Sequence, residues 1–168
     1  MEKERYYIFL DVDGVLYDYA WIKKNNKDVR TIRKFKKESI DALNLLISNL
    51  EKKYDVDIVI TSTWRLYKFQ TLLSMLEYSG LNYAKDIHKT HESIRPFTRG
   101  EDILSYLKHR KNPNNYVIID DESFDFAKYF NTTKIIKPNI QNNALNTEMV
   151  TKFLSDNKLL KNDKELTF

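Results

Sequence analysis

The chain has no cysteine among its 168 residues. Disulfide bonds, a thiolate nucleophile and cysteine-ligated zinc or iron–sulfur centres are therefore excluded. Glycine and proline are scarce, with three of each, and no Gly/Pro-rich linker divides the chain. Since a domain has about 150 residues, the length predicts one domain, which we expect over residues 1–157, followed by a polar tail at 158–168.

Long hydrophobic runs are also missing. Apolar stretches such as 6–10 and 58–60 fall far short of the roughly 20 residues that a membrane-spanning helix needs. The first residues mix both charge signs and contain too few apolar residues for a signal-peptide core. We therefore expect no transmembrane segment and a cytoplasmic location.

The net charge of +4 is mild, but basic residues are concentrated in one segment. Residues 23–37 contain Lys23, Lys24, Lys27, Arg30, Arg33, Lys34, Lys36 and Lys37 against a single acid, Asp28. Such a run is either a solvated surface or a binding surface for a polyanion such as nucleic acid.

Four apolar runs rich in β-branched and aromatic residues predict buried parallel strands, at 6–12, 56–62, 116–120 and 133–137. Helical periodicity occupies the intervals between them. It predicts helices over 39–53, over 66–76 with Gly80 just beyond the end, from Thr98 onward, and over 147–156. The spacing of Thr98 and Glu101 matches a capping box. Alternating strands and helices predict an α/β fold around a mostly parallel sheet.

Acidic pairs follow two of the predicted strands. Asp11 and Asp13 end the first strand, and Asp120 and Asp121 end the third. Ligands of open parallel sheets bind at the carboxyl ends of the strands, so these acids should converge. Two carboxylates about 4 Å apart repel by on the order of 4 kcal/mol at an effective dielectric near 20. A cation is therefore expected between them, and oxygen ligands favour Mg²⁺.

The DVDG stretch contains groups suited to phosphoryl transfer. Asp11 can act as the nucleophile and carry an aspartyl-phosphate, and Asp13 is close enough to act as general acid and base. Thr61 and Ser62, after the second strand, can hold phosphate oxygens. Arg99, at the start of a helix, can bind an anion.

Together, DVDGV, ITST, the helix-starting arginine and VIIDD resemble the ordered motifs of the haloacid dehalogenase-like (HAD) phosphohydrolases. DVDGVL, TSTWR, TRGEDILSYL and VIIDD are similar, more narrowly, to small HAD domains associated with RNA-repair proteins. The likeness spans about residues 6–145. It implies a Rossmann-like core with a central first strand, helices on both faces of the sheet, and a Mg²⁺-dependent phosphatase.

In such an enzyme, the metal would be bound by Asp11, the Asp13 backbone carbonyl, and Asp120 or Asp121. The phosphate would be held by Thr61, Ser62 and Arg99. Most HAD enzymes have lysine at the position given to Arg99, so Lys89 and Arg95 remain alternatives. Asp125 fits an alternative acidic spacing.

No full cap domain fits in the roughly 47 residues between Gly14 and Thr61. An open site suits a phosphate on a large substrate such as an RNA or DNA end. An insert at about 17–37 places aromatic residues beside the basic run, where rings can stack on bases while lysines track the backbone. Candidate substrate contacts are Tyr17, Trp21, Lys23, Lys24, Trp64 and Arg65, unless the rings pack in the core.

Three other functions were compared with nucleic-acid end processing. A small-molecule or 5′-nucleotide phosphatase would use the same residues. A catalytically silent binding module for nucleic acid or protein would have no need of clustered acids. A signalling receiver domain would place its phosphorylated aspartate at the end of the middle strand, where this chain has Thr61 and Ser62. The oligomeric state is not predicted.

Overall fold

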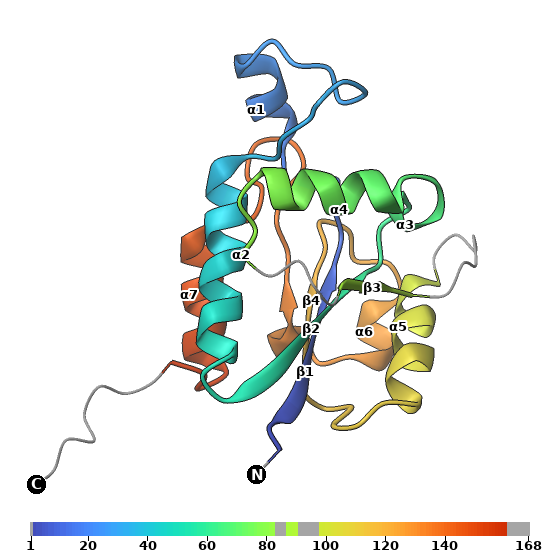
Figure 1. Cartoon of the computed structure of the whole chain (residues 1–168). Coiled ribbons are helices and arrows are strands. Elements are labelled where there is room, and N and C mark those ends of the chain that lie inside the picture. The colour runs from blue at the N-terminus through green and yellow to red at the C-terminus, as the bar shows by residue number, and fades with distance from the viewer. Residues whose placement is uncertain (1, 83–86, 91–97, 161–168) are drawn as a thin grey trace, which may run out of the picture.

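The computed structural model describes residues 2–82, 87–90 and 98–160. It contains a five-stranded, all-parallel sheet in the order β3-β2-β1-β4-β5, with helices on both sides (Figure 1). The strands are β1 (Glu4–Leu10), β2 (Tyr54–Ile60), β3 (Ile87–Lys89), β4 (Tyr116–Ile119) and β5 (Ile135–Ile136). The α/β fold with a central first strand is confirmed.

Side chains of β1 alternate between two hydrophobic cores, as expected for a strand buried on both faces. Tyr6, Ile8 and Leu10 join the core beneath α2, α4 and α7, whereas Tyr7 and Phe9 join the core beneath α5 and α6. These helices are α2 (Lys37–Leu50), α4 (Phe69–Tyr78), α5 (Arg99–Lys108), α6 (Phe126–Tyr129) and α7 (Thr147–Asp156). Figure 1 shows α2 and α7 on one side of the sheet and α5 and α6 on the other.

Several predicted boundaries differ from the structure. The helix at 147–156 is confirmed as α7, but the helix at 66–76 is divided into α3 (Trp64–Tyr67) and α4. Gly80 has a φ of +93°, which fits its predicted place after the helix end. The strand at 133–137 shortens to two residues, because Thr132–Lys134 form a 3₁₀ turn, η1. The three-residue strand β3 was not predicted.

The insert contains one short helix, α1 (Tyr19–Lys24), whose N-cap is Asp18. It projects beyond the carboxyl end of the sheet (Figure 1). We call residues 19–35 the arm. Among the described residues, no helix combines the length and apolarity needed to cross a membrane.

Candidate active site

The register of the sheet brings three strand ends to one level. Leu10 pairs with Ile60 on one side and with Ile119 on the other. The residues that follow continue this pattern: the Thr61 N–H donates to the Leu10 carbonyl at 3.0 Å, and the Asp11 N–H donates to the Ile119 carbonyl at 3.0 Å. The side chains after β1, β2 and β4 therefore lie at one edge of the sheet, as the sequence predicted.

Three carboxylates gather at this edge. Ligand oxygens of Asp11, Asp120 and Asp121 all lie within 4.8 Å of one another. Asp11 and Asp120 are buried, and Asp121 is half-buried. Burial, together with the charge of Asp11, raises the pKa of Asp120 to about 8 and that of Asp121 to about 6. Burial likewise raises the pKa of Asp11. The cluster has the composition of a site for a hard divalent cation.

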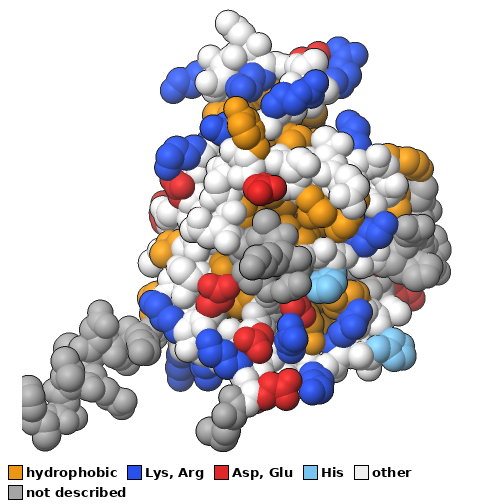
Figure 2. Space-filling view, in the orientation of Figure 1, with side chains coloured by type: hydrophobic (Ala, Val, Ile, Leu, Met, Phe, Trp, Pro, Cys, Tyr) orange, Lys and Arg blue, Asp and Glu red, His pale blue; other side chains and the backbone are white. Residues whose placement is uncertain are grey.

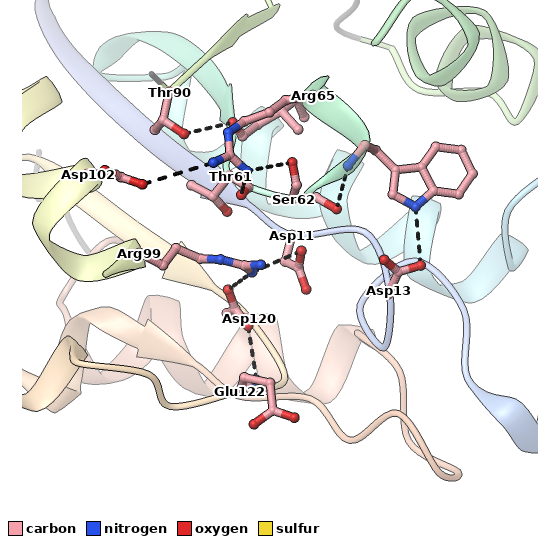
Figure 3. Close-up of polar contacts among 12 residues, drawn as sticks. Asp11, Asp13, Thr61, Ser62, Arg65, Thr90, Arg99, Asp102, Asp120 and Glu122 are labelled. Atoms are coloured by element: carbon pink, nitrogen blue, oxygen red, sulfur yellow. Dashed lines mark hydrogen bonds and ion pairs between the residues drawn. The ribbon is translucent and has the colours of Figure 1, made fainter. Parts of the chain in front are cut away.

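Arg99 reaches this cluster from the first turn of α5. Its Nη1 lies 3.0 Å from Asp11 Oδ1 and 2.5 Å from Asp120 Oδ2 (Figure 3). Burial opposes the charge on Arg99, but the two carboxylates outweigh it and raise the pKa of the guanidinium. The guanidinium carbon lies 4.3 Å from the centroid of the Phe124 ring. Phe124, a contact that the sequence analysis missed, therefore limits where Arg99 can turn.

The alternative cations are placed differently. Lys89 Nζ lies 5.4 Å above the Phe69 ring, and within the described ranges no ion pair joins it to the carboxylate cluster. Arg95 lies outside the described residues. Among the candidates that the structure describes, Arg99 is the cation at the cluster.

Asp125 is engaged with α5 rather than with the carboxylate cluster. Its Oδ1 accepts the Gly100 N–H at 2.6 Å, and its Oδ2 accepts the Glu101 N–H at 3.2 Å. Thr98 occupies the N-cap position, but its side chain makes no capping hydrogen bond, so the predicted capping box is wrong. The cap comes instead from a residue 25 positions away from Gly100, a long-range contact that local spacing cannot reveal.

Thr61 and Ser62 lie at the end of β2, next to Asp11 (Figure 3). Both are buried. Within the described part of the chain, Thr61 Oγ1 has no hydrogen-bond partner. A buried hydroxyl without a partner is uncommon and points to a ligand that the hydroxyl would bind.

Arg65 was predicted to contact substrate, but its guanidinium points inward. Nη1 donates to the carbonyls of Thr61 at 2.6 Å and Ser62 at 2.9 Å, and Nη2 lies 4.0 Å from Asp102 Oδ2 (Figure 3). Only 5% of Arg65 is exposed. Asp102, its partner, was not singled out from the sequence.

Tyr17 and Trp64 were also predicted to contact substrate. Tyr17 is 1% exposed, too buried for stacking on a base, so this prediction is wrong. Its hydroxyl donates to Asp13 Oδ1, and the Trp64 indole Nε1 donates to the same oxygen at 3.2 Å. Both side chains therefore contact a predicted catalytic group. Trp64 is half-buried, and its contact with substrate stays a prediction.

The arm displays the remaining candidates. Lys23 and Lys24 are exposed at the end of α1, and Trp21 is half-buried with Lys27 Nζ 5.3 Å above its ring. Figure 2 shows lysine and arginine side chains gathered over the projection that α1 forms in Figure 1. Part of the basic run is structural, since Lys36 pairs with buried Asp18.

Comparisons with known proteins place this geometry in a family. A family model described as "HAD domain in Swiss Army Knife RNA repair proteins" matches residues 7–150, from within β1 to within α7. No curated protein and no solved structure matches the chain. The matched domain type indicates a phosphatase-type hydrolase with a link to RNA repair. The chain therefore belongs to the family of HAD domains found in Swiss Army Knife RNA repair proteins.

Proposed function

We propose that the chain is a Mg²⁺-dependent phosphomonoester hydrolase that forms an aspartyl-phosphate on Asp11 and acts on phosphorylated RNA or DNA ends. The observation that carries this proposal is the cluster of Asp11, Asp120 and Asp121 with Arg99 at its edge. Two buried carboxylates and a half-buried third outnumber the Arg99 guanidinium beside them, and a divalent cation would offset the excess negative charge.

The donor set fits Mg²⁺. Asp11, Asp120 and Asp121 supply carboxylate oxygens, and the Asp13 backbone carbonyl is a further candidate ligand. Gly14 allows the chain to pass close to Asp121: a Cβ at Gly14 would lie 2.6 Å from Asp121 Cγ. When bound, Mg²⁺ would neutralise charge on the phosphate and on the carboxylates around it.

The residues of the chain would then divide the reaction between them. An Asp11 oxygen attacks phosphorus while the bond from phosphorus to the leaving oxygen breaks. Arg99 and the Thr61 hydroxyl, which has no hydrogen-bond partner among the described residues, stabilise charge on the phosphoryl oxygens, with Ser62 beside them. Asp13 gives its proton to the leaving oxygen and later takes a proton from the water that hydrolyses the aspartyl-phosphate.

The arm supports a nucleic-acid substrate. It stands at the same end of the sheet as the carboxylate cluster and exposes Lys23 and Lys24. Lysines beside a site for a terminal phosphate suit a polyanion that extends away from its end. The link of the family to RNA repair supports the same substrate class.

The first experiment tests the nucleophile. Asp11→Asn should lower Mg²⁺-dependent hydrolysis of p-nitrophenyl phosphate on the order of 10³-fold or more, because the amide cannot form the acyl-phosphate. Asp55→Asn, which changes an exposed carboxylate near the amino end of β2, is the matched control and should retain full activity. Turnover that survives in Asp11→Asn would exclude Asp11 as nucleophile, and Mg²⁺ binding without turnover in the unaltered protein would favour a silent binding module.

The second experiment tests the substrate. The double variant Lys23→Ala/Lys24→Ala should raise KM for phosphorylated oligonucleotides and lower the slope of log KM against log salt by about two, with p-nitrophenyl phosphate unaffected. The control is Lys108→Ala/Lys111→Ala. These two exposed lysines lie at and just beyond the C-terminal end of α5, whereas Arg99 lies at its N-terminal end. Equal effects on both substrates would favour a small-molecule or 5′-nucleotide phosphatase.

A further inference from the structure

The carboxylate of Asp13 receives two hydrogen bonds on a single oxygen. The Tyr17 hydroxyl and the Trp64 indole Nε1 both donate to Oδ1, the latter at 3.2 Å. Oδ2 receives no hydrogen bond from the residues that the structure describes. One oxygen of the carboxylate is therefore fixed by the protein, and the other remains available for proton exchange.

Each donor belongs to a rigid part of the molecule. Tyr17 is buried, and its backbone forms a bridge with that of Asp13 across the turn that contains Gly14. Trp64 begins α3, and its backbone N–H donates to Ser62 Oγ at 3.4 Å. The indole ring packs against Phe35, with the ring centroids 6.2 Å apart. Because the two donors come from different segments of the chain and each is held by further contacts, they restrict rotation of the Asp13 carboxylate.

Both side chains can keep a hydrogen bond to Oδ1 in either protonation state of Asp13. An indole N–H can only donate. A tyrosine hydroxyl can either donate or accept, and the Tyr17 hydroxyl donates to Oδ1 here. The two contacts therefore persist whether or not Asp13 carries the proton that it exchanges.

We propose that Tyr17 and Trp64 are positioning residues that hold Oδ1 of Asp13, so that Oδ2 is the oxygen that transfers the proton to the leaving group. The inference rests on the proposed role of Asp13 as general acid. It assigns both aromatic side chains to the first chemical step rather than to substrate binding. Proton transfer is sensitive to placement, since general acids act within about 3.2 Å of the atom they protonate.

The test compares leaving groups. Trp64→Phe and Tyr17→Phe should each lower kcat/KM for an alkyl phosphate such as β-glycerophosphate about tenfold, because an alkoxide needs a proton in order to leave. The same variants should change kcat/KM for p-nitrophenyl phosphate by less than about twofold, since p-nitrophenolate is stable without a proton. Tyr67→Phe removes the hydroxyl of a tyrosine that is 80% exposed and is the matched control.

Repeating both substitutions in the Asp13→Asn variant separates a positioning role from general damage to the fold. In Asp13→Asn, neither aromatic substitution should lower the alkyl-phosphate rate further, because residues that act as one unit are not additive. Equal losses for both leaving groups, or losses that add to that of Asp13→Asn, would overturn the inference.

The contact can also be tested without activity. The chain has two tryptophans, so its spectrum contains two indole N–H signals, and Trp64→Phe assigns them. Asp13→Ala should move the Trp64 indole proton upfield and speed its exchange with solvent, while the Trp21 signal stays in place. An unchanged Trp64 signal would overturn the inference. Failure of the proposed function is a different result, since it appears as absent hydrolysis or as hydrolysis that survives Asp11→Asn.

Discussion

Lys36 Nζ donates to Asp18 Oδ2 at 2.8 Å, and this pair joins the two ends of the arm. The Asp18 side chain is 1% exposed. Its Oδ1 caps α1 through the Trp21 N–H at 2.8 Å, and its Oδ2 also accepts the Ala144 N–H at 3.1 Å. Burial would raise the pKa of Asp18, but these hydrogen bonds and the Lys36 charge outweigh burial and lower it. One carboxylate thus anchors the arm to the body of the domain.

Lys36→Met should therefore destabilise the protein by about 1–3 kcal/mol, because it leaves a buried carboxylate without its ion-pair partner. The free energy of unfolding from urea titration measures this loss. Lys37→Met, next to it in sequence, removes a lysine that is 85% exposed and pairs with Asp41 on the surface. That control should change stability by less than about 0.5 kcal/mol. Equal effects of the two variants would contradict the anchoring role.

Gly14→Ala should weaken Mg²⁺ binding by at least about tenfold and destabilise the fold by about 1–2 kcal/mol. Gly14 has a φ of +74°, and a Cβ there would lie 2.6 Å from both Cγ and Oδ2 of Asp121. The side chain of Asp121 would have to move away from Asp11 and Asp120. Calorimetric titration with Mg²⁺ measures the affinity.

Gly80→Ala is the matched control for Gly14→Ala. The φ of Gly80 is +93°, but apart from its two chain neighbours no described residue has an atom within 4 Å of a Cβ placed there. It should therefore reproduce the backbone strain and leave the affinity for Mg²⁺ unchanged. If both variants lost Mg²⁺ equally, strain rather than the approach to Asp121 would explain the result.

Asp125→Ala should lower stability by about 0.5–2 kcal/mol, the range for loss of a helix N-cap. Because the cap orients the turn that carries Arg99, the rate of phosphate-ester hydrolysis should fall as well. Asp125→Asn retains an oxygen that can accept one of the two N–H groups and should lose less of both. In Glu101→Ala, stability should stay within about 0.5 kcal/mol, since Asp125 and not Glu101 supplies the capping contacts. A larger loss in Glu101→Ala would restore the capping-box interpretation.

The carboxylate cluster predicts how stability depends on pH and metal. The pKa of Asp120 is raised from 3.8 to about 8, and that of Asp121 from 3.8 to about 6. From the ordinary pKa of 3.8 up to the raised pKa of each carboxylate, the folded state holds a proton that the unfolded chain has released. The free energy of unfolding without metal should therefore fall as pH rises from about 4 toward about 8. Because Mg²⁺ binds the deprotonated cluster, it should raise the melting temperature more at about pH 8 than at about pH 5.

Thermal unfolding with EDTA or Mg²⁺ at both pH values measures this dependence. Asp120→Asn removes a carboxylate whose pKa is raised to about 8, so the melting temperature of this variant should respond less to both pH and Mg²⁺. A rise on adding Mg²⁺ that is the same at both pH values in the unaltered protein would show that protons and metal do not compete for this cluster.

Much of the fold was predictable because its signals are local. The apolar runs that became β1, β2 and β4 are buried and continuous, and the α7 helix begins and ends where periodicity predicted. β3 and β5, with three and two residues, are too short to give a periodic pattern. The break between α3 and α4 at Lys68 has no proline or glycine to mark it.

For the site, the sequence alone determined that acids follow β1 and β4 and that hydroxyls follow β2, because residues after parallel strands meet at one edge. Only the tertiary structure decided the partner of each side chain. Tyr17 and Trp64 contact Asp13, and Arg65 turns toward Asp102. Asp125 caps α5, and Lys36 pairs with Asp18. Most of these pairs join residues far apart in the chain, and a hydrogen bond depends on distance and direction in space, which spacing along the sequence does not specify.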